Sequence, residues 1–192
     1  LQSRGLGDVY KRQPVVDEIC SRLGDVVYGT DMNSIEERVV ALLKEKGKKI
    51  ATAESCTAGY IPKRLTDIPG ASEVFECGIV SYSNDIKTKL LGVSPKTLET
   101  YGAVSEQTAR EMALGAKHVS GADIAISTTG LAGPGGDGVL PGGLSFAAVT
   151  DGERTVVEKI VTGHENDREY NRYVTASRAL NLVRLMLEEK IK

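Results

Sequence analysis

The sequence predicts an α/β protein in which a mixed, mostly parallel sheet of about five strands carries helices on both faces. Segments with the pattern of strands alternate along the chain with segments of helical periodicity. One pair of strand-like segments, "LSFAAVT" and "RTVVEKIVT", is joined by Asp151-Gly152, a dipeptide typical of a hairpin turn. The 192 residues are 41% hydrophobic and 26% charged, which suits a globular chain with one main core.

The first residues are interpreted separately from the fold. "DVYKRQ", at residues 8–13, is what GAT-GTG-TAT-AAG-AGA-CAG encodes, and this resembles the transposon end joined to DNA in library preparation. We therefore interpret residues 1–13 as translated adapter, which should lack contacts with the core. Residues 14–31 combine a helical spacing with a short strand, "DVVYGT", and are too small to fold alone. They are interpreted as the remnant of a linker or preceding domain, and 32–192 as the main domain.

The first half of the main domain alternates helix and strand. A helix begins near Ser34, which stands three residues before Glu37 in the spacing of a capping box. A strand at about 49–53 leads into the segment "AESCTAG" and a further helix. The next strand, at about 76–83, is followed by a helix that Asn84 can cap. Each strand thus leads into a helix, as expected for a parallel sheet.

The second half repeats this alternation and adds the hairpin. Ser94-Pro95 and Ser105 have the side chains expected at the starts of two helices. The remaining strands are expected at about 122–128, 144–150 and 154–162. A glycine-rich loop, "GLAGPGGDGVLPGG", separates the first two of these strands, and a final helix runs from Asp167.

Composition excludes several classes of protein. The formal charge of −2 and the lack of a basic stripe argue against a nucleic-acid partner. No apolar run approaches the ~18 residues that a membrane span requires, so no membrane partner is expected. The three cysteines, Cys20, Cys56 and Cys77, fit neither a disulfide framework nor a zinc site and indicate a reducing, cytoplasmic setting.

Three adjacent residues with nucleophilic side chains, Ser55, Cys56 and Thr57, follow the first strand of the main domain. If a helix begins there, its free N–H groups would stabilise an oxyanion next to the serine. The alternative is that Ser55 or Thr57 only caps the helix. Cys56 is expected to be a small buried thiol, because no histidine partner lies nearby.

A nucleophilic serine needs a base. Of the two histidines, His118 is expected on a helix surface, and His164 lies in a loop without the spacing of a triad. "SYSNDIKTK" offers Lys87 in a first helical turn, where the helix dipole lowers a lysine pKa. Lys87 could then deprotonate the serine, with Tyr82 orienting it or relaying the proton. The alternative is that Lys87 and Lys89 are solvated charges.

The glycine-rich loop is a candidate anion site. Its backbone N–H groups could approach a phosphate or a carboxylate, although a long turn without a ligand is the alternative. The spacing matches neither a Walker motif nor a dinucleotide fingerprint, which excludes a nucleotide triphosphatase. Arg168 and Arg172, one turn apart at the start of the last helix, could hold a phosphate.

Four segments together resemble a known family. From about Ser34 to Glu188, "ATAESCTAG", "GIVSYSNDIKTKLLGV", "GAVSEQTAREMA" and "TTGLAGPGG" are similar to the C-terminal domain of the CinA (competence-damage-inducible) family. The resemblance implies a three-layer α/β/α fold and a bacterial nicotinamide-mononucleotide deamidase of pyridine nucleotide salvage. It also implies no metal or other cofactor and a homo-oligomer, a homodimer or larger. Residues 14–31 resemble the linker to an N-terminal molybdopterin-binding-like domain of longer members.

With this reaction, the candidate residues named above are expected to have the following roles. The catalytic residues would be Ser55 as nucleophile, Lys87 as base and Tyr82 in the hydrogen-bond network. The backbone N–H groups of Cys56 and Thr57 would hold the oxyanion. The substrate phosphate would lie against the loop at Thr129, Gly130 and Gly133, with Arg168 as its charged partner.

Two positions depart from the family pattern. Ala58 stands where the family usually has glycine, which is tolerated if the helix has already begun. Leu140-Pro141-Gly142-Gly143 replaces the usual Lys-Pro-Val-Gly and removes a positive charge near the ligand.

Two alternative functions remain beside the amidohydrolase. One is a module that binds a pyridine nucleotide without turnover, and the other is an accessory domain of an ADP-ribose pyrophosphatase whose N-terminal domain is missing.

Overall fold

The computed structural model describes the backbone of residues 2–191 and the side chains of residues 12–191. The chain divides into two compact units, Leu1–Ser34 and Ile35–Lys192. The first unit contains α1 (Gln2–Leu23) and the 3-10 helix η1 (Gly24–Val26). The expected strand at "DVVYGT" is therefore wrong, because an isolated extended segment gains no ladder hydrogen bonds. Side chains before residue 12 lie outside the described residues, so the adapter interpretation stays a prediction.

The second unit is built on a mixed sheet of five strands. The strands are β1 (Ile50–Glu54), β2 (Phe75–Val80), β3 (Ile124–Gly130), β4 (Leu144–Thr150) and β5 (Thr155–Val161). Their order across the sheet is β2-β1-β3-β4-β5. β1 pairs in parallel with β2 and β3, whereas β4 is antiparallel to both of its neighbours. Four strands thus share one direction, and the mixed, mostly parallel sheet is confirmed.

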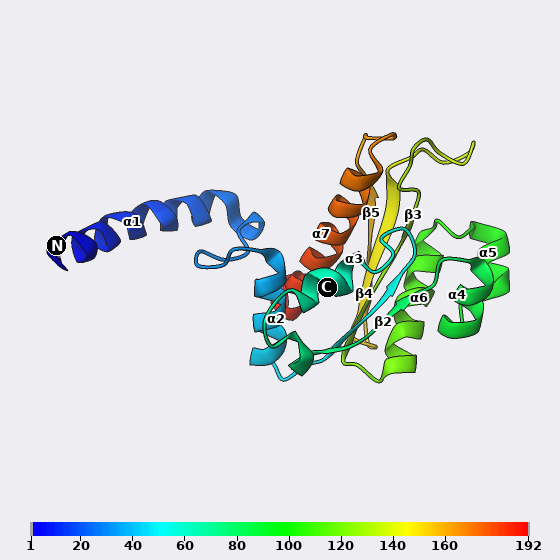
Figure 1. Cartoon of the computed structure of the whole chain (residues 1–192), viewed down its shortest axis with the longest axis horizontal. Coiled ribbons are helices and arrows are strands. Elements are labelled where there is room, and N and C mark those ends of the chain that lie inside the picture. The colour runs from blue at the N-terminus through cyan, green and yellow to red at the C-terminus, as the bar shows by residue number, and fades with distance from the viewer. Residues whose placement is uncertain (1, 192) are drawn as a thin grey trace. The chain divides into compact units, whose positions relative to one another are not determined.

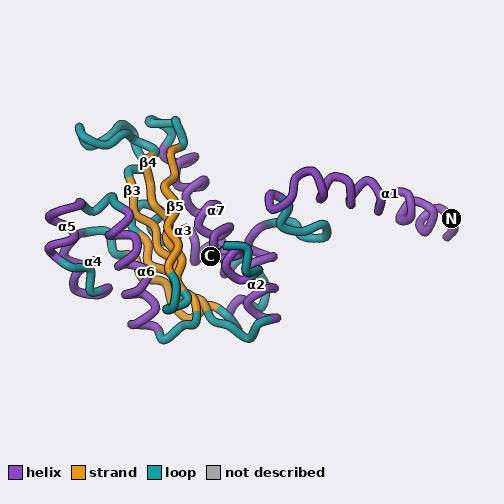
Figure 2. The backbone as a smooth tube through the Cα atoms, turned by 180° about the vertical axis from the view of Figure 1, so that it is seen from behind, coloured by secondary structure: helices purple, strands orange, loops and turns teal. Residues whose placement is uncertain are grey.

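Helices cover both faces of this sheet (Figures 1 and 2). The helices are α2 (Ile35–Glu45), α3 (Tyr60–Thr66), the 3-10 helix η2 (Ala71–Glu73), α4 (Asn84–Leu91), α5 (Pro95–Tyr101), α6 (Glu106–Ser120) and α7 (Arg168–Leu187). α2, α3 and α7 pack with one face of the sheet, and α4 and α6 with the other. The three-layer arrangement is confirmed.

The two faces of the sheet are packed with side chains of different size. Ile124 and Ile126 join the large core under α2, α3 and α7, and Ala125 between them faces the opposite side. There the sheet meets small residues of α6, and a methyl group at Gly115 would overlap the carbonyl of Leu91 in α4. Because Leu91 is the last residue of α4, this close approach fixes the end of α4 against α6.

The start of α4 differs by one residue from the sequence prediction. Ser83, not Asn84, is the N-cap, and its Oγ accepts a hydrogen bond from the Ile86 N–H at 3.3 Å. Ser83 has extended backbone angles, as an N-cap requires, and Asn84 is already helical. Lys87 is therefore the fourth helical residue.

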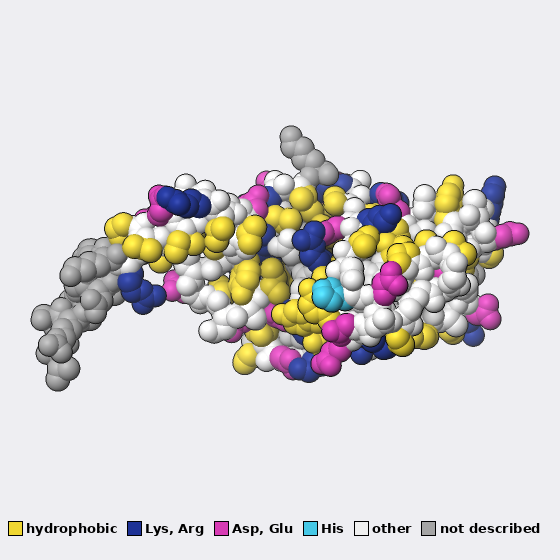
Figure 3. Space-filling view, turned by 90° about the horizontal axis from the view of Figure 1, so that it is seen from above, with side chains coloured by type: hydrophobic (Ala, Val, Ile, Leu, Met, Phe, Trp, Pro, Cys, Tyr) yellow, Lys and Arg dark blue, Asp and Glu magenta, His cyan; other side chains and the backbone are white. Residues whose placement is uncertain are grey.

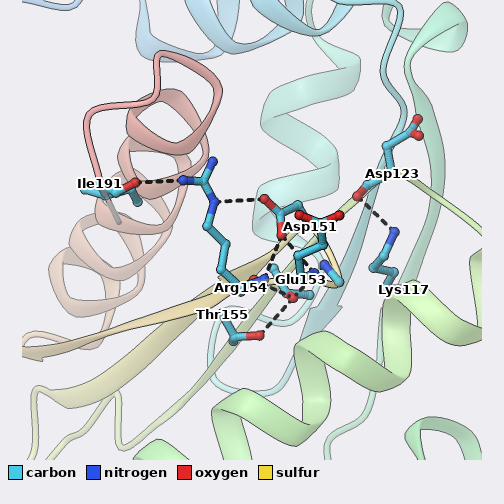
Figure 4. Close-up of polar contacts among 9 residues, drawn as sticks. Lys117, Asp123, Asp151, Glu153, Arg154, Thr155 and Ile191 are labelled. Atoms are coloured by element: carbon cyan, nitrogen blue, oxygen red, sulfur yellow. Dashed lines mark hydrogen bonds and ion pairs between the residues drawn. The ribbon is translucent and has the colours of Figure 1, made fainter.

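The hairpin turn lies at the amino-terminal edge of the parallel strands. The Asp151 carboxylate accepts from the N–H groups of Glu153 and Arg154 and from the Arg154 guanidinium (Figure 4). Arg154 also donates to the carbonyl of Ile191 at 3.1 Å, which joins the hairpin to the segment after α7. These hydrogen bonds fix the turn between the antiparallel strands β4 and β5, so the expected hairpin is confirmed.

The surface carries charges of both signs. On the face shown in Figure 3, basic and acidic side chains are interspersed, without a stripe of one sign that could follow a phosphate backbone. Within the described residues, no helix is both long enough and apolar enough to cross a membrane.

Candidate active site

The candidate site lies at the carboxyl edge of the parallel strands. The chain leaves β1 toward α3 on one face and leaves β2 toward α4 on the other face. Adjacent strands whose connections diverge in this way leave a crevice at their carboxyl ends. A cavity of about 330 Å³ opens there. Its lining includes Ser55, Cys56, Tyr82, Lys87, Thr129, Gly130, Gly133 and Arg168.

Ser55 and Lys87 are in direct contact inside this cavity. Lys87 Nζ donates to Ser55 Oγ at 3.1 Å, and the lysine side chain is only 1% exposed. Nζ also donates to the carbonyls of Ser81 at 2.9 Å and Tyr82 at 3.2 Å. All three acceptors are uncharged, so no carboxylate among these partners stabilises the ammonium form.

The pKa of Lys87 is lowered, and the main cause is burial, which penalises the charged ammonium. The direction agrees with the sequence prediction, although burial rather than the helix dipole explains it. A neutral amine in this place has a lone pair directed at a hydroxyl within hydrogen-bond distance. The arrangement can remove the proton from Ser55 and so activate it as a nucleophile.

Cys56 has the opposite character. Its thiol is buried, and burial raises its pKa to about 12. A thiol with such a pKa is almost entirely protonated at neutral pH, and the thiolate is the reactive form. Of the adjacent serine and cysteine, the serine is therefore the one with a base available.

The loop after β1 is not the start of a helix. Residues 56–59 form a turn, and α3 begins only at Tyr60. The prediction that the N–H groups of Cys56 and Thr57 lie at a helix start is wrong. The physical reason is Glu54, whose buried carboxylate Oε2 accepts from the Ile61 N–H at 3.2 Å, so that the start of α3 faces Glu54.

Ala58 lies within this turn at a φ of 49°. Left-handed backbone angles suit glycine, and they are strained for alanine. The condition under which alanine was expected to be tolerated, a helix already begun, is therefore not met.

Thr57 and Arg172 hold the loop from outside the cavity. Thr57 is fully buried, and its Oγ1 lies 2.6 Å from Oγ1 of Thr128. Arg172 donates from Nη2 to the Thr57 carbonyl at 2.7 Å and does not line the cavity. The prediction that Arg172 grips a phosphate together with Arg168 is therefore replaced by a structural contact with the loop.

Tyr82 and Arg168 stand together at the rim of the cavity. The Tyr82 side chain is 60% exposed, and Arg168 Nη2 lies 3.4 Å from its hydroxyl. Arg168 also donates from Nη1 to the Gly133 carbonyl at 2.9 Å. Tyr82 contacts Lys87 through its backbone carbonyl, and its phenol is directed to Arg168.

Another part of the cavity wall is made largely of backbone. Thr129 directs its hydroxyl to the carbonyl of Ala103 at 2.6 Å, so it supports the wall rather than facing a ligand. A side chain at Gly130 would overlap Ser145, and one at Gly133 would overlap the carbonyl of Glu165. Only glycine lets the backbone approach so closely at these positions.

Neither histidine lines the cavity. His118 is exposed in the last turn of α6, and the exposed ring of His164 lies against Tyr170. Among the residues that the structure describes, no group of three or more His, Cys, Asp and Glu is placed to hold a metal ion.

Sequence reasoning missed Glu54. It stands directly before Ser55 in "AESCT", at the end of a strand that is otherwise apolar or small. A charged residue at a fully buried strand position was the available signal.

Fold and site together define an α/β protein with a buried serine–lysine pair in a crevice at the carboxyl edge of its sheet. The CinA C-terminal domain family matches residues 32–187, and the chain belongs to the CinA family. A CinA-like protein from Desulfovibrio desulfuricans is 44% identical over 174 residues, which cover 90% of this chain and 41% of that protein. Another from Chloroherpeton thalassium is 47% identical over 178 residues, covering 90% of this chain and 42% of that protein.

Solved structures agree with this assignment. The competence/damage inducible protein CihA from Agrobacterium tumefaciens has a TM-score of 0.76 and 38% identity, covering 83% of this chain and 99% of its own. A CinA superfamily protein from Klebsiella pneumoniae has a TM-score of 0.77 and 29% identity, covering 81% of this chain and 96% of its own. The chain spans about two fifths of the length of the curated relatives it matches.

Proposed function

We propose that this chain hydrolyses the carboxamide of nicotinamide mononucleotide to nicotinate mononucleotide and ammonia. The observation that carries the proposal is the 3.1 Å contact between Lys87 Nζ and Ser55 Oγ within the cavity. A buried amine without a carboxylate partner has no evident structural purpose, because burying an ammonium lowers stability. The same amine is well suited to accept the proton of a nucleophile.

The mechanism follows from this pair. Lys87 takes the Ser55 proton as Oγ attacks the carboxamide carbon, and the backbone N–H of Cys56 is proposed to donate to the oxyanion that forms. The protonated lysine then gives its proton to the departing nitrogen, and ammonia leaves. Water attacks the acyl-serine ester with Lys87 again as base, which releases the nicotinate product and restores Ser55.

Substrate binding is assigned to the rim. Arg168 is exposed beside the cavity, and its contacts at Gly133 and Tyr82 are to uncharged oxygens. A guanidinium so placed can bind a phosphate, and the glycine-rich loop can add backbone donors. Tyr82, 60% exposed, offers a ring surface beside the same arginine.

Two other functions are separated from this one by a single assay. A non-catalytic pyridine-nucleotide-binding module needs no nucleophile with a base. An accessory role for an ADP-ribose pyrophosphatase is favoured only by the greater length of the relatives, of which the chain spans about two fifths. Release of ammonia from nicotinamide mononucleotide by the isolated chain supports the hydrolase and contradicts both alternatives.

The test of the nucleophile uses two neighbouring substitutions. Ser55→Ala should give a folded protein whose turnover falls by several orders of magnitude. Cys56→Ala is the matched control and should remain largely active, because the Cys56 thiol, with a pKa of about 12, is protonated. Loss of turnover in Cys56→Ala with activity kept in Ser55→Ala would instead identify a thiol enzyme.

A further inference from the structure

Glu54 is a buried carboxylate that the proposed reaction leaves without a role. It is the last residue of β1, its side chain is fully buried, and it does not line the cavity. Burial raises the pKa of its carboxyl, whereas the Thr57 hydroxyl and the N–H groups of Ile61, Tyr60 and Gly59 act in the opposite direction by hydrogen bonding. In the described structure Oε2 of Glu54 accepts from the Ile61 N–H at 3.2 Å, whereas Oε1 is buried without a hydrogen-bond partner.

The loop that Glu54 holds has an unfavourable backbone. Ala58 and Gly59 have φ angles of 49° and 87°, within the turn that carries Ser55. Such angles at a non-glycine residue persist only where the surroundings impose them. Glu54 anchors the far end of the turn through the Ile61 N–H at 3.2 Å.

The backbone of Glu54 is also linked to Lys87, through the hydrogen bonds of Ser81. Its carbonyl accepts from the Ser81 N–H at 2.8 Å. The carbonyl of Ser81 in turn accepts from Lys87 Nζ at 2.9 Å. One residue thus connects the loop that carries the nucleophile with the backbone group that holds the base.

We propose that Glu54 is a positioning residue whose buried carboxylate fixes the loop 55–59 so that Ser55 Oγ meets Lys87 Nζ. A neutral residue of similar volume would avoid the penalty of burying a charge, so stability alone does not explain a glutamate here. The proposal rests on the proposed hydrolase only for its substrate, because the reactivity of Ser55 can be measured without nicotinamide mononucleotide.

The test compares two glutamates that make the same kind of contact. Glu54→Gln can keep an acceptor for the Ile61 N–H, but it removes the negative charge and replaces the second oxygen with an amide donor. Glu111→Gln is the matched control, because Glu111 accepts from the Ser94 N–H at 2.7 Å and the Thr97 hydroxyl at 2.6 Å and does not line the cavity. Each protein is assayed for kcat and KM of deamidation and for sulfonylation of Ser55 by phenylmethylsulfonyl fluoride, followed by mass spectrometry.

Glu54→Gln is expected to lower kcat on the order of 100-fold, the effect of a small misplacement of reacting groups, with KM nearly unchanged. Sulfonylation of Ser55, in which the Oγ–S bond forms and fluoride leaves, should slow by a similar factor. Glu111→Gln should match the wild type in both assays. The proposal is overturned if the two variants behave alike, or if Glu54→Gln raises KM and leaves kcat and sulfonylation unchanged.

Two further outcomes are also decisive. If circular dichroism shows Glu54→Gln to be unfolded, Glu54→Asp, which keeps the carboxylate but withdraws it from the Ile61 N–H by one methylene, replaces it. Slower sulfonylation then supports the proposal, and an unchanged rate overturns it.

A wild-type chain that is sulfonylated at Ser55 but releases no ammonia contradicts the proposed substrate alone. The ratio of the sulfonylation rates of the variants still decides the role of Glu54. A wild type inert in both assays overturns both proposals.

Discussion

At the scale of single residues, Lys87 illustrates how surroundings change the chemistry of a side chain. Its three hydrogen bonds satisfy all three donors of an ammonium group, yet burial still lowers its pKa. The hydrogen bonds hold the amine in place, and burial makes it easier to deprotonate. Both effects are needed for a base that is correctly placed and available.

The pH dependence of turnover should follow Lys87. Because only the neutral amine accepts a proton, kcat/KM should rise with pH, with a midpoint below the ordinary pKa of lysine. Lys87→Met should abolish the activity at every pH, and Lys89→Met, a change at an exposed position of the same helix, should leave the profile unchanged. A profile that is flat across this range in the wild type would contradict the role of Lys87.

The lowered pKa of Lys87 also predicts how the stability of the protein depends on pH. In the folded protein the pKa of Lys87 is lowered, so between the folded and unfolded pKa values the unfolded chain binds more protons. The contribution of Lys87 to the free energy of unfolding should therefore rise with pH across that window. Urea unfolding of the wild type and of Lys87→Met at several pH values measures this contribution as their difference.

The sequence identifies the individual site residues better than their contacts. The motif around Ser55 and the helix start before Lys87 are visible in the chain, because caps and strand ends have local signals. The contact between them, across 32 residues, depends on the pairing of β1 with β2. Strand register and the burial of Lys87 are tertiary properties, so the sequence predicts Lys87 as a possible base but not its distance from Ser55.

At the scale of elements, the alternating pattern predicts the sheet and most helix starts correctly. Ser105 and Asp167 cap α6 and α7, and each accepts a backbone N–H three residues ahead. The loop after β1 is the exception, since a cap supplied by the preceding strand has no local sequence rule. Glu54 takes the place of the local Ser or Thr cap and delays α3 until Tyr60.

Ala58→Gly should stabilise the protein. The φ of 49° is strained for alanine, and relief of this strain should raise the free energy of unfolding by about 1 kcal/mol, less the extra entropy of glycine in the unfolded chain. Ala41→Gly, within α2, is the control and should lower it by about 1 kcal/mol. Urea unfolding measures both values. Destabilisation by both substitutions would show that the turn accommodates alanine without strain.

Gly130→Ala should destabilise the protein. The added methyl group would overlap Ser145 of the neighbouring strand β4, and such overpacking costs about 1–3 kcal/mol. Val139→Ala in the same connection, at a side chain that is 89% exposed, should change stability by less than about 0.5 kcal/mol. Equal unfolding midpoints for the two variants would contradict the close packing described for this wall.

At the scale of the whole molecule, the fold and the site lie within one unit. All five strands and every proposed site residue belong to Ile35–Lys192, and the family match covers residues 32–187. Arg38 of α2 pairs with Glu188 just after α7 at 2.9 Å, so the two ends of the unit are joined. The unit has its own hydrophobic core, and an ion pair joins its first helix to the segment after its last helix. These are properties expected of an independently folding domain.

Removal of residues 1–31 should therefore leave the protein intact. A chain of residues 32–192 is expected to unfold at the same temperature as the full chain and to release ammonia from nicotinamide mononucleotide at the same rate. Differential scanning calorimetry and the ammonia assay compare the two chains. Loss of activity in the shorter chain would show that residues 1–31 contribute to the site.

The homo-oligomer implied by the family resemblance stays a proposal. Sedimentation velocity at micromolar concentration should show a dimer or a larger species. Only a monomer at that concentration would contradict it.

The backbone wall of the cavity has a consequence for how the specificity of this protein can be changed. Gly136 and Gly142, like Gly130, have no space for a side chain, whereas the tip at Gly138 is open. Asp137 fixes the tip by accepting the N–H groups of Val139 at 2.9 Å and Leu140 at 2.7 Å. A mutational library aimed at new substrates should therefore vary Val139 and Leu140 and leave the glycines and Asp137 unchanged. Such a library would vary side chains at the exposed tip of the loop between β3 and β4, and few of its variants should be unfolded.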